Sequence, residues 1–199
     1  MARTIEQRHQ TGFTTLELVM VMAVMLIVSA IALPSIMRTR RIYQLNGAAS
    51  QMVDVLKRTR FDAIRGDGAV NCSIRANGTT MLVWSDTNAN GVPDPNEVQA
   101  FFSAPVTPVA AAGVPGTGAL ANSVGSGAAI ALNPIAPATG VALTFDQRGA
   151  VTAPAGVNVV YLAYQGVADP GYRAVIILPS GSVQVWQADS TGTNWHLFD

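Results

Sequence analysis

The sequence contains few of the residues that form disulfides, metal centres and most catalytic sites. Cys72 is the only cysteine, so the chain cannot form an intramolecular disulfide. Lys57 is the only lysine, and the two histidines, His9 and His196, stand near opposite ends of the sequence. A nucleophile and its general base must lie within hydrogen-bond reach of each other. With so few candidate residues, we do not expect an enzyme.

Charged residues are also scarce: they make up 12% of the sequence, and the formal net charge is zero. This neutral total hides a segregation along the chain. Residues 38–65 carry seven basic side chains against two carboxylates, a net charge of +5, whereas the residues from 66 onward carry a net charge of −5. A domain that binds nucleic acid over a broad face is usually basic. The acidic C-terminal part therefore argues against that class of function.

One long apolar run stands near the N-terminus. No charged residue occurs from Leu18 to Leu33, and the sequence is mostly apolar from Phe13 to Met37. As a helix rising about 1.5 Å per residue, this stretch spans a hydrocarbon layer of about 30 Å. A soluble core helix is rarely apolar on every face, and the arginine-rich pattern that follows is unlike the start of a secreted mature domain. The run predicts a membrane-spanning helix.

The helical pattern continues beyond the apolar run, because apolar residues recur near every 3.6 positions until the turn at 66–68. These residues are Ile42, Leu45, Ala49, Met52, Leu56 and Ala63. We therefore predict one long helix over 13–65, whose first part, 13–37, spans the membrane and whose second part, 38–65, is amphipathic. Pro34 removes one backbone hydrogen bond and is expected to kink or locally melt this helix.

From residue 66 the hydrophobic pattern alternates, which is typical of strands. The predicted strands are 69–77, 79–85, 98–102, 141–145, 157–164, 172–178 and 182–187. Asn77-Gly78 predicts a tight hairpin between the first two. Residues 103–140 are mostly small or apolar and carry no charge, which predicts a long irregular loop with room for one short strand. The fold class is therefore α+β, with an antiparallel β domain over 66–199 packed on the amphipathic helix.

The segment 86–97, DTNANGVPDPNE, fits the spacing of a twelve-residue calcium loop. Its oxygen ligands would come from Asp86, Asn88, Asn90, the carbonyl of Val92, Asp94 and Glu97. Strands flank it, so it would be a calcium-binding hairpin with millimolar affinity, because only three carboxylates contribute. The same composition is typical of turns in which Asn and Asp side chains bond to the backbone. A calcium loop and a metal-free turn both remain open, and no other cofactor is expected.

The residues Gly12-Phe13-Thr14-Thr15-Leu16-Glu17 follow a short polar leader and precede a helix that contains Pro34. This pattern resembles the class III signal of type IV pilins and pseudopilins. The resemblance implies that a prepilin peptidase removes residues 1–12 by cutting between Gly12 and Phe13, and that Phe13 is then N-methylated. It also implies that Glu17, the fifth mature residue, pairs with the N-terminal amine of a neighbouring subunit and sets its register during assembly. The alternative is that Glu17 lies at headgroup level and is solvated there.

The rest of the chain resembles the GspH/FimT branch of minor pilins in three stretches, 46–74, 143–151 and 173–186. This resemblance implies a pilin-like fold and a minor subunit that helps initiate or cap a type IV pilus or a type II secretion pseudopilus. Its partners would be other pilins or pseudopilins, the peptidase and the inner-membrane assembly platform.

The resemblance also implies a topology: a single span in the bacterial inner membrane, with the body in the periplasm and later in a filament. The charge distribution points the other way. Arg38, Arg40 and Arg41 follow the span, whereas Arg3 and Arg8 precede it, and the positive-inside rule places the more basic flank in the cytoplasm. We follow the family topology.

DNA uptake is the alternative function within the same branch. Its DNA-binding members carry G-R-x-R in the last hairpin, where the arginines reach phosphates. The matching stretch here, Gly181-Ser182-Val183-Gln184, contains neither arginine. Because phosphate contacts supply most non-specific affinity for DNA, the sequence favours a structural subunit over a DNA-binding one.

Overall fold

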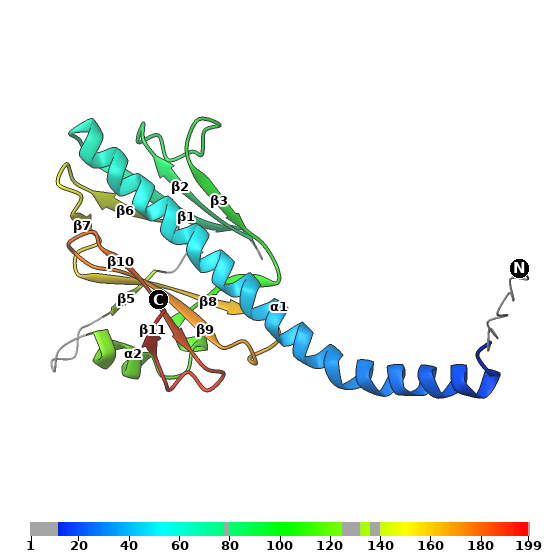
Figure 1. Ribbon diagram of the computed structural model, residues 1–199. Helices are drawn as coiled ribbons and strands as arrows, with labels where there is room; N and C mark the ends of the chain where they lie inside the picture. Colours follow the sequence, from blue (N-terminus) through cyan, green and yellow to red (C-terminus); the bar gives the residue numbers. More distant parts are fainter. Residues whose placement is uncertain (1–11, 78–79, 125–131, 136–139, 199) are drawn as a thin grey trace, which may run out of the picture. The chain divides into compact units, whose positions relative to one another are not determined.

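The computed structural model describes residues 12–77, 80–124, 132–135 and 140–198. The chain forms two compact units, Met1–Arg38 and Thr39–Asp199, which are described separately here. The described part of the first unit is the beginning of helix α1, Thr15–Gly66. The second unit holds the remainder of α1 and every described strand (Figure 1).

Helix α1 begins and ends within two residues of the range expected from the sequence. It is assigned without interruption through Pro34, so the expected local melting is not observed there, and the kink stays a prediction. The buried residues all belong to the second half and recur at helical spacing, which gives this half one apolar face. They are Leu45, Ala48, Ala49, Met52, Val53, Val55, Leu56, Thr59 and Ala63.

The strands form two sheets. The first sheet has the order β3-β2-β1-β6-β7 and is antiparallel throughout. Its strands are β1 (Val70–Asn77), β2 (Thr80–Asp86), β3 (Gln99–Phe102), β6 (Val141–Phe145) and β7 (Val151–Ala153). Residues 78 and 79, at the predicted Asn77-Gly78 hairpin, lie outside the described residues. The strands form the predicted antiparallel hairpin, but Asn77 pairs with Thr80 as the last strand residue, so the turn begins one position later than Asn77-Gly78 predicts.

The second sheet has the order β11-β10-β9-β8-β4. Its strands are β4 (Val106–Val109), β8 (Val157–Tyr164), β9 (Tyr172–Ile177), β10 (Val183–Ala188) and β11 (His196–Leu197). A short strand, β5 (Leu132–Pro134), pairs with β8 in parallel, so the prediction of an antiparallel domain holds for every described pair except this one.

Two cores cover the two faces of the second sheet. The first core packs the second half of α1 against the first sheet and one face of the second, and it includes Leu56, Cys72, Phe145 and Leu162. The second core covers the opposite face through residues such as Val159, Tyr161 and Trp195. Strand β8 contributes side chains to both cores, which explains why its sequence is apolar at nearly every position.

The prediction of an irregular loop over 103–140 is wrong for much of this segment. It contains β4, a 3₁₀ turn η1 (Ala111–Gly113), helix α2 (Thr117–Val124) and β5. Val114 and Leu120 are buried in the second core. A few apolar side chains suffice, because they pack against β8 and β9 and do not build a core alone.

Candidate functional site

The predicted cleavage site lies in exposed chain immediately before α1. Gly12, Phe13 and Thr14 are not helical, and the Phe13 side chain is 81% exposed. Residues 1–11 of the leader lie outside the described residues. Both residues that flank the Gly12–Phe13 peptide bond are therefore exposed, and cleavage at this bond stays a prediction.

Thr14 fixes where the helix begins. Its Oγ1 accepts a hydrogen bond from the backbone N–H of Glu17 at 3.2 Å, the geometry of an N-cap. Thr14 and Glu17 also have the T-x-x-E spacing of a capping box. This role of Thr14 was not predicted, although the T-x-x-E spacing could have revealed it.

Glu17 lies exposed in the first turn of α1, where a carboxylate interacts favourably with the helix dipole. Within the residues that the structure describes, no side chain pairs with its carboxylate. The expected pairing with a neighbouring subunit's amine stays a prediction.

The helix residues that follow Glu17 expose a continuous apolar surface. Within the described part of the chain, α1 is the one helix long and apolar enough to cross a membrane, with a mean hydropathy of 2.7 over its most apolar 18 residues. None of that stretch is buried inside the protein. An apolar surface of this extent marks contact with a membrane or with other proteins.

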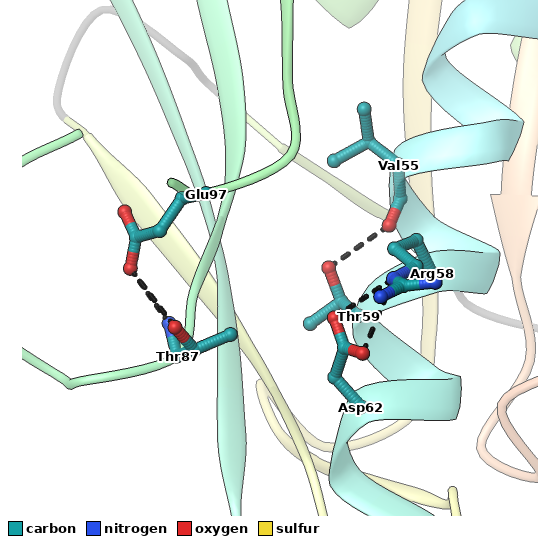
Figure 2. Close-up of polar contacts among 6 residues, drawn as sticks. All are labelled: Val55, Arg58, Thr59, Asp62, Thr87 and Glu97. Atoms are coloured by element: carbon teal, nitrogen blue, oxygen red, sulfur yellow. Dashed lines mark hydrogen bonds and ion pairs between the residues drawn. The ribbon is translucent and has the colours of Figure 1, made fainter. Parts of the chain in front are cut away.

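The second half of α1 makes polar contacts of its own. Arg58 forms an ion pair with Asp62 one turn later, with an Nε–Oδ1 distance of 3.2 Å (Figure 2). The buried Thr59 hydroxyl donates to the Val55 carbonyl at 2.9 Å. Thr59 thus satisfies its hydroxyl inside the helix, which allows it to face the core.

The candidate calcium loop is closed by its own carboxylates. Asp86 is buried, and its Oδ1 and Oδ2 accept the N–H groups of Asn90 and Gly91 at 3.1 and 3.0 Å. Glu97 Oε1 accepts the Thr87 N–H at 2.9 Å (Figure 2). Its Oε2 accepts the Asp94 N–H at 3.1 Å. All four oxygens of these two side chains are therefore occupied by donors from the loop.

The amide residues of the loop are used in the same way. The Oδ1 atoms of Asn88 and Asn90 accept backbone N–H groups two residues on, and both Nδ2 groups donate to Asp94 Oδ2, at 2.7 and 2.9 Å. Across the described ranges no cluster of three acidic, His or Cys side chains could hold a metal ion. In this conformation the donor set fits the metal-free turn better than the calcium loop, so of the two open alternatives we expect the metal-free turn, which a measurement of ion binding tests.

The loop covers Trp84. This residue alternates with Met81, Val83 and Ser85 along β2 and belongs to neither core, yet it is only 1% exposed. The guanidinium of Arg75 lies 5.4 Å from its ring centroid, and Arg75 Nη2 donates to the Gly91 carbonyl at 3.2 Å. Arg75 thus joins the indole ring to the loop, which gives the loop a packing role.

The turn in the segment 143–151 packs against the turn that carries Gly181. Asp146 Oδ1 accepts the N–H groups of Arg148 and Ala150 at 2.9 and 2.8 Å. Gly149 and Gly181 both have positive φ, 77° and 75°, and a β-carbon on Gly181 would collide with the Gly149 carbonyl. The close contact between the two turns therefore requires glycine at position 181, whereas a β-carbon on Gly149 would meet the side chains of Ile64 and Arg60 in α1.

Residues 181–184 form this turn and the start of β10, and they provide no cation. A basic side chain does lie beside them: a β-carbon on Gly181 would stand 3.0 Å from Arg60 Nε of α1. The sequence pattern gave no signal of this contact, because Arg60 lies more than a hundred residues earlier.

The remaining candidates for chemistry are structural. Cys72 is buried, which raises the pKa of its thiol to about 12 against a smaller opposing effect of the Thr59 hydroxyl. A thiol with that pKa is a poor nucleophile at neutral pH. His196 lies exposed in β11, with its Nε2 2.7 Å from Gln187 Nε2. Trp195 packs edge-on against Tyr161, with 6.2 Å between ring centroids.

The fold has similar solved structures, whereas the sequence has no similar family model or curated protein. No family model matches the chain, and no curated protein matches it. Two crystal forms of the type IV minor pilin FimU from Pseudomonas aeruginosa are similar in structure. One is 19% identical with a TM-score of 0.45 and covers 75% of this chain and 91% of its own. The other is 18% identical with a TM-score of 0.43 and covers 74% and 94%.

Proposed function

We propose that this protein is a minor pilin or pseudopilin, a structural subunit that enters a filament through its N-terminal helix. The observation that carries the proposal is the start of α1: exposed residues on both sides of the Gly12–Phe13 bond, a Thr14 cap, and a Glu17 carboxylate and apolar surface that no described residue pairs with or buries. A helix with these properties needs a second apolar environment. A membrane provides it before assembly, and neighbouring helices provide it afterwards.

The same helix serves both the anchor and the body. Its first half is exposed throughout, whereas its second half supplies eight buried apolar residues to the first core. A subunit drawn into a filament by its first half therefore carries the β domain with it. This continuity supports a structural role, in which the function of the chain is its position in an assembly.

Glu17 has the central part in this proposal. A carboxylate is strongly destabilising in a dry helical core unless a cation pairs with it. Cleavage after Gly12 would create an amine on Phe13, four residues before Glu17, and the amine of an adjacent subunit would neutralise the acid and set the register.

The first experiment tests processing. The full chain is co-expressed with a prepilin peptidase, and the N-terminus of the product is determined by mass spectrometry. We expect a chain that begins at methylated Phe13, and no cleavage in Gly12→Val. A wild-type chain that keeps residues 1–12 would contradict the proposal.

The second experiment tests assembly. Glu17→Ala should be cleaved as efficiently as the wild type but enter sheared filaments poorly, whereas Glu17→Asp should retain part of its incorporation. Normal incorporation of Glu17→Ala would overturn the role given to this residue. Deletion of the gene, followed by twitching and exoprotein assays, then distinguishes a pilus from a secretion pseudopilus.

A further inference from the structure

Arg40 and Arg41 of α1 follow the apolar stretch closely, and the proposed assembly assigns no role to them. We infer that Arg40 and Arg41, with Tyr43, bind the phosphate groups of anionic phospholipids before the subunit leaves the membrane. This inference rests on the proposed function, because it requires the first half of α1 to span the bilayer.

The distance along the helix places these residues at headgroup level. The apolar stretch ends at Met37, and Arg40 and Tyr43 follow it by three and six residues in the same helix. At about 1.5 Å per residue they lie roughly 4 to 9 Å beyond the apolar stretch. The polar region of each leaflet is roughly 5 to 7 Å thick, so Arg40 lies within it. Tyr43 begins just beyond it, and its side chain reaches back into it because helical side chains point toward the N-terminus.

The exposure of the side chains agrees with this position. Arg40 is exposed, and Tyr43 is 72% exposed although it is aromatic. Tyrosine is favoured at the membrane interface, where its ring contacts the acyl boundary and its hydroxyl contacts headgroups. No core residue precedes Leu45 in the helix, so packing inside the β domain does not account for Tyr43.

The surroundings of Arg41 agree with phosphate binding. Arg41 is held in place by an aromatic ring, because its guanidinium lies 5.8 Å from the centroid of Tyr164 at the end of β8. Such a contact leaves the guanidinium donors available for a bidentate interaction with phosphate.

This interpretation also accounts for the basic flank on the far side of the membrane. Arginines at that position oppose the orientation that the family topology requires. A role in binding anionic lipid gives them a function on the side that carries the body. It predicts that the subunit enriches anionic lipid around itself.

The test uses the full chain in phosphatidylcholine bilayers that contain traces of spin-labelled lipid. Electron paramagnetic resonance measures the fraction of label immobilised at the protein, for phosphatidylglycerol and phosphatidylcholine separately. We expect phosphatidylglycerol to associate at least about threefold more strongly at low salt, and the preference to fall as salt screens the arginines.

Variants locate the interaction. Arg40→Gln with Arg41→Gln should reduce the preference to about equal association, whereas Arg40→Lys with Arg41→Lys should retain part of it, because lysine keeps the charge but not the bidentate geometry. The matched control, Lys57→Gln with Arg65→Gln, removes two exposed positive charges farther along α1 and should leave the preference unchanged. Equal association of both lipids with the wild type, or a preference that survives the double Gln variant, would overturn the inference.

The result is separable from the proposed function. The measurement needs neither the peptidase nor another subunit, so a lipid preference can be found even if cleavage or filament entry fails. Conversely, a chain that is cleaved and assembled but shows no preference would reject the lipid site alone.

Discussion

Arg173 of β9 donates its Nε–H to Oδ1 of Asn46 in α1 at 2.7 Å, which joins residues 127 positions apart. Arg173 is only 3% exposed, and burial lowers the pKa of its guanidinium to about 10. A buried cation is tolerated when its donors are satisfied, and a second bond runs from Nη1 to the Tyr172 carbonyl at 2.9 Å. Asn46 therefore joins α1 to the second sheet through a buried charged group, and losing this hydrogen bond should lower the stability of the fold.

The first prediction concerns this bond. Asn46→Ala removes the acceptor and leaves a buried charged donor unpaired, so we expect the free energy of unfolding to fall by about 1–3 kcal/mol. Ser50→Ala, an exposed change one turn later in the same helix, should alter it by less than about 0.5 kcal/mol. Denaturant titration of the full chain in detergent measures both. Equal stabilities of the two variants would mean that water replaces Asn46 as the hydrogen-bond acceptor for Arg173.

The second prediction concerns the contact between Gly149 and Gly181. Gly181→Ala must introduce a side chain at positive φ and also displace the Gly149 carbonyl. Gly166 has a similar φ, 73°, with open space around it, so Gly166→Ala measures the cost of the backbone conformation alone. We expect that control to cost about 1 kcal/mol and Gly181→Ala to cost roughly 1–3 kcal/mol more, as overpacking does. Similar melting temperatures for the two variants would show that the turns can separate freely.

The third prediction concerns the loop of residues 86–97. Glu97→Gln places an amide NH₂ where one of two backbone N–H groups needs an acceptor, so we expect a loss of about 1–3 kcal/mol. Asn96→Ala, an exposed neighbour, is the control and should be near neutral. Because the carboxylates of Asp86 and Glu97 are already engaged, we expect calorimetry of the full chain to show no heat at millimolar Ca²⁺. A heat of binding that disappears in Glu97→Gln would show instead that the loop rearranges around the ion.

The fourth prediction concerns Cys72 and alkaline pH. The pKa of its thiol is raised by burial from 9.0 to about 12, so the folded state keeps a proton that the unfolded state releases. The stability from the neutral thiol is complete below pH 9 and is lost as the pH rises from 9 to 12, at up to about 1.4 kcal/mol per pH unit. Cys72→Ala should lack this part of the slope, although it will be less stable at neutral pH. Parallel slopes for the two proteins above pH 9 would contradict the assignment.

The sequence predicted most of the fold because its patterns are local. The long helix and seven strands follow from periodicity, and each lies where it was expected to within a few residues. The segment 103–140 was misjudged for a nonlocal reason. Leu120 and Val114 are buried only because β8 and β9 offer a second apolar face. The continuous apolar stretches of those strands were the available signal, since a strand buried on both faces needs a cover on each.

Less of the candidate site than of the fold could be predicted from the sequence. The residues Gly12, Phe13 and Glu17 were identified by a motif, and the structure adds the Thr14 cap and the exposure of the helix. The loop of residues 86–97 shows the limit of such motifs. The motif predicts which side chains carry oxygen atoms. It does not predict whether those oxygens face a central ion or accept hydrogen bonds from the backbone N–H groups of the loop, as they do here. Arg75 over Trp84 was unforeseen for the same reason, because it depends on how β1, β2 and the loop meet.

The position of β8 between two cores has a consequence for hydrogen exchange. If the second core opens, the face of β8 that lies in the first core stays covered by α1 and the first sheet. If the first core opens, the opposite face of β8 stays covered by the second core. No single local fluctuation frees the amides at the centre of this strand. They should exchange with solvent deuterium only through global unfolding, so the slowest amides of the protein, those near Val159 to Leu162, report its total stability directly.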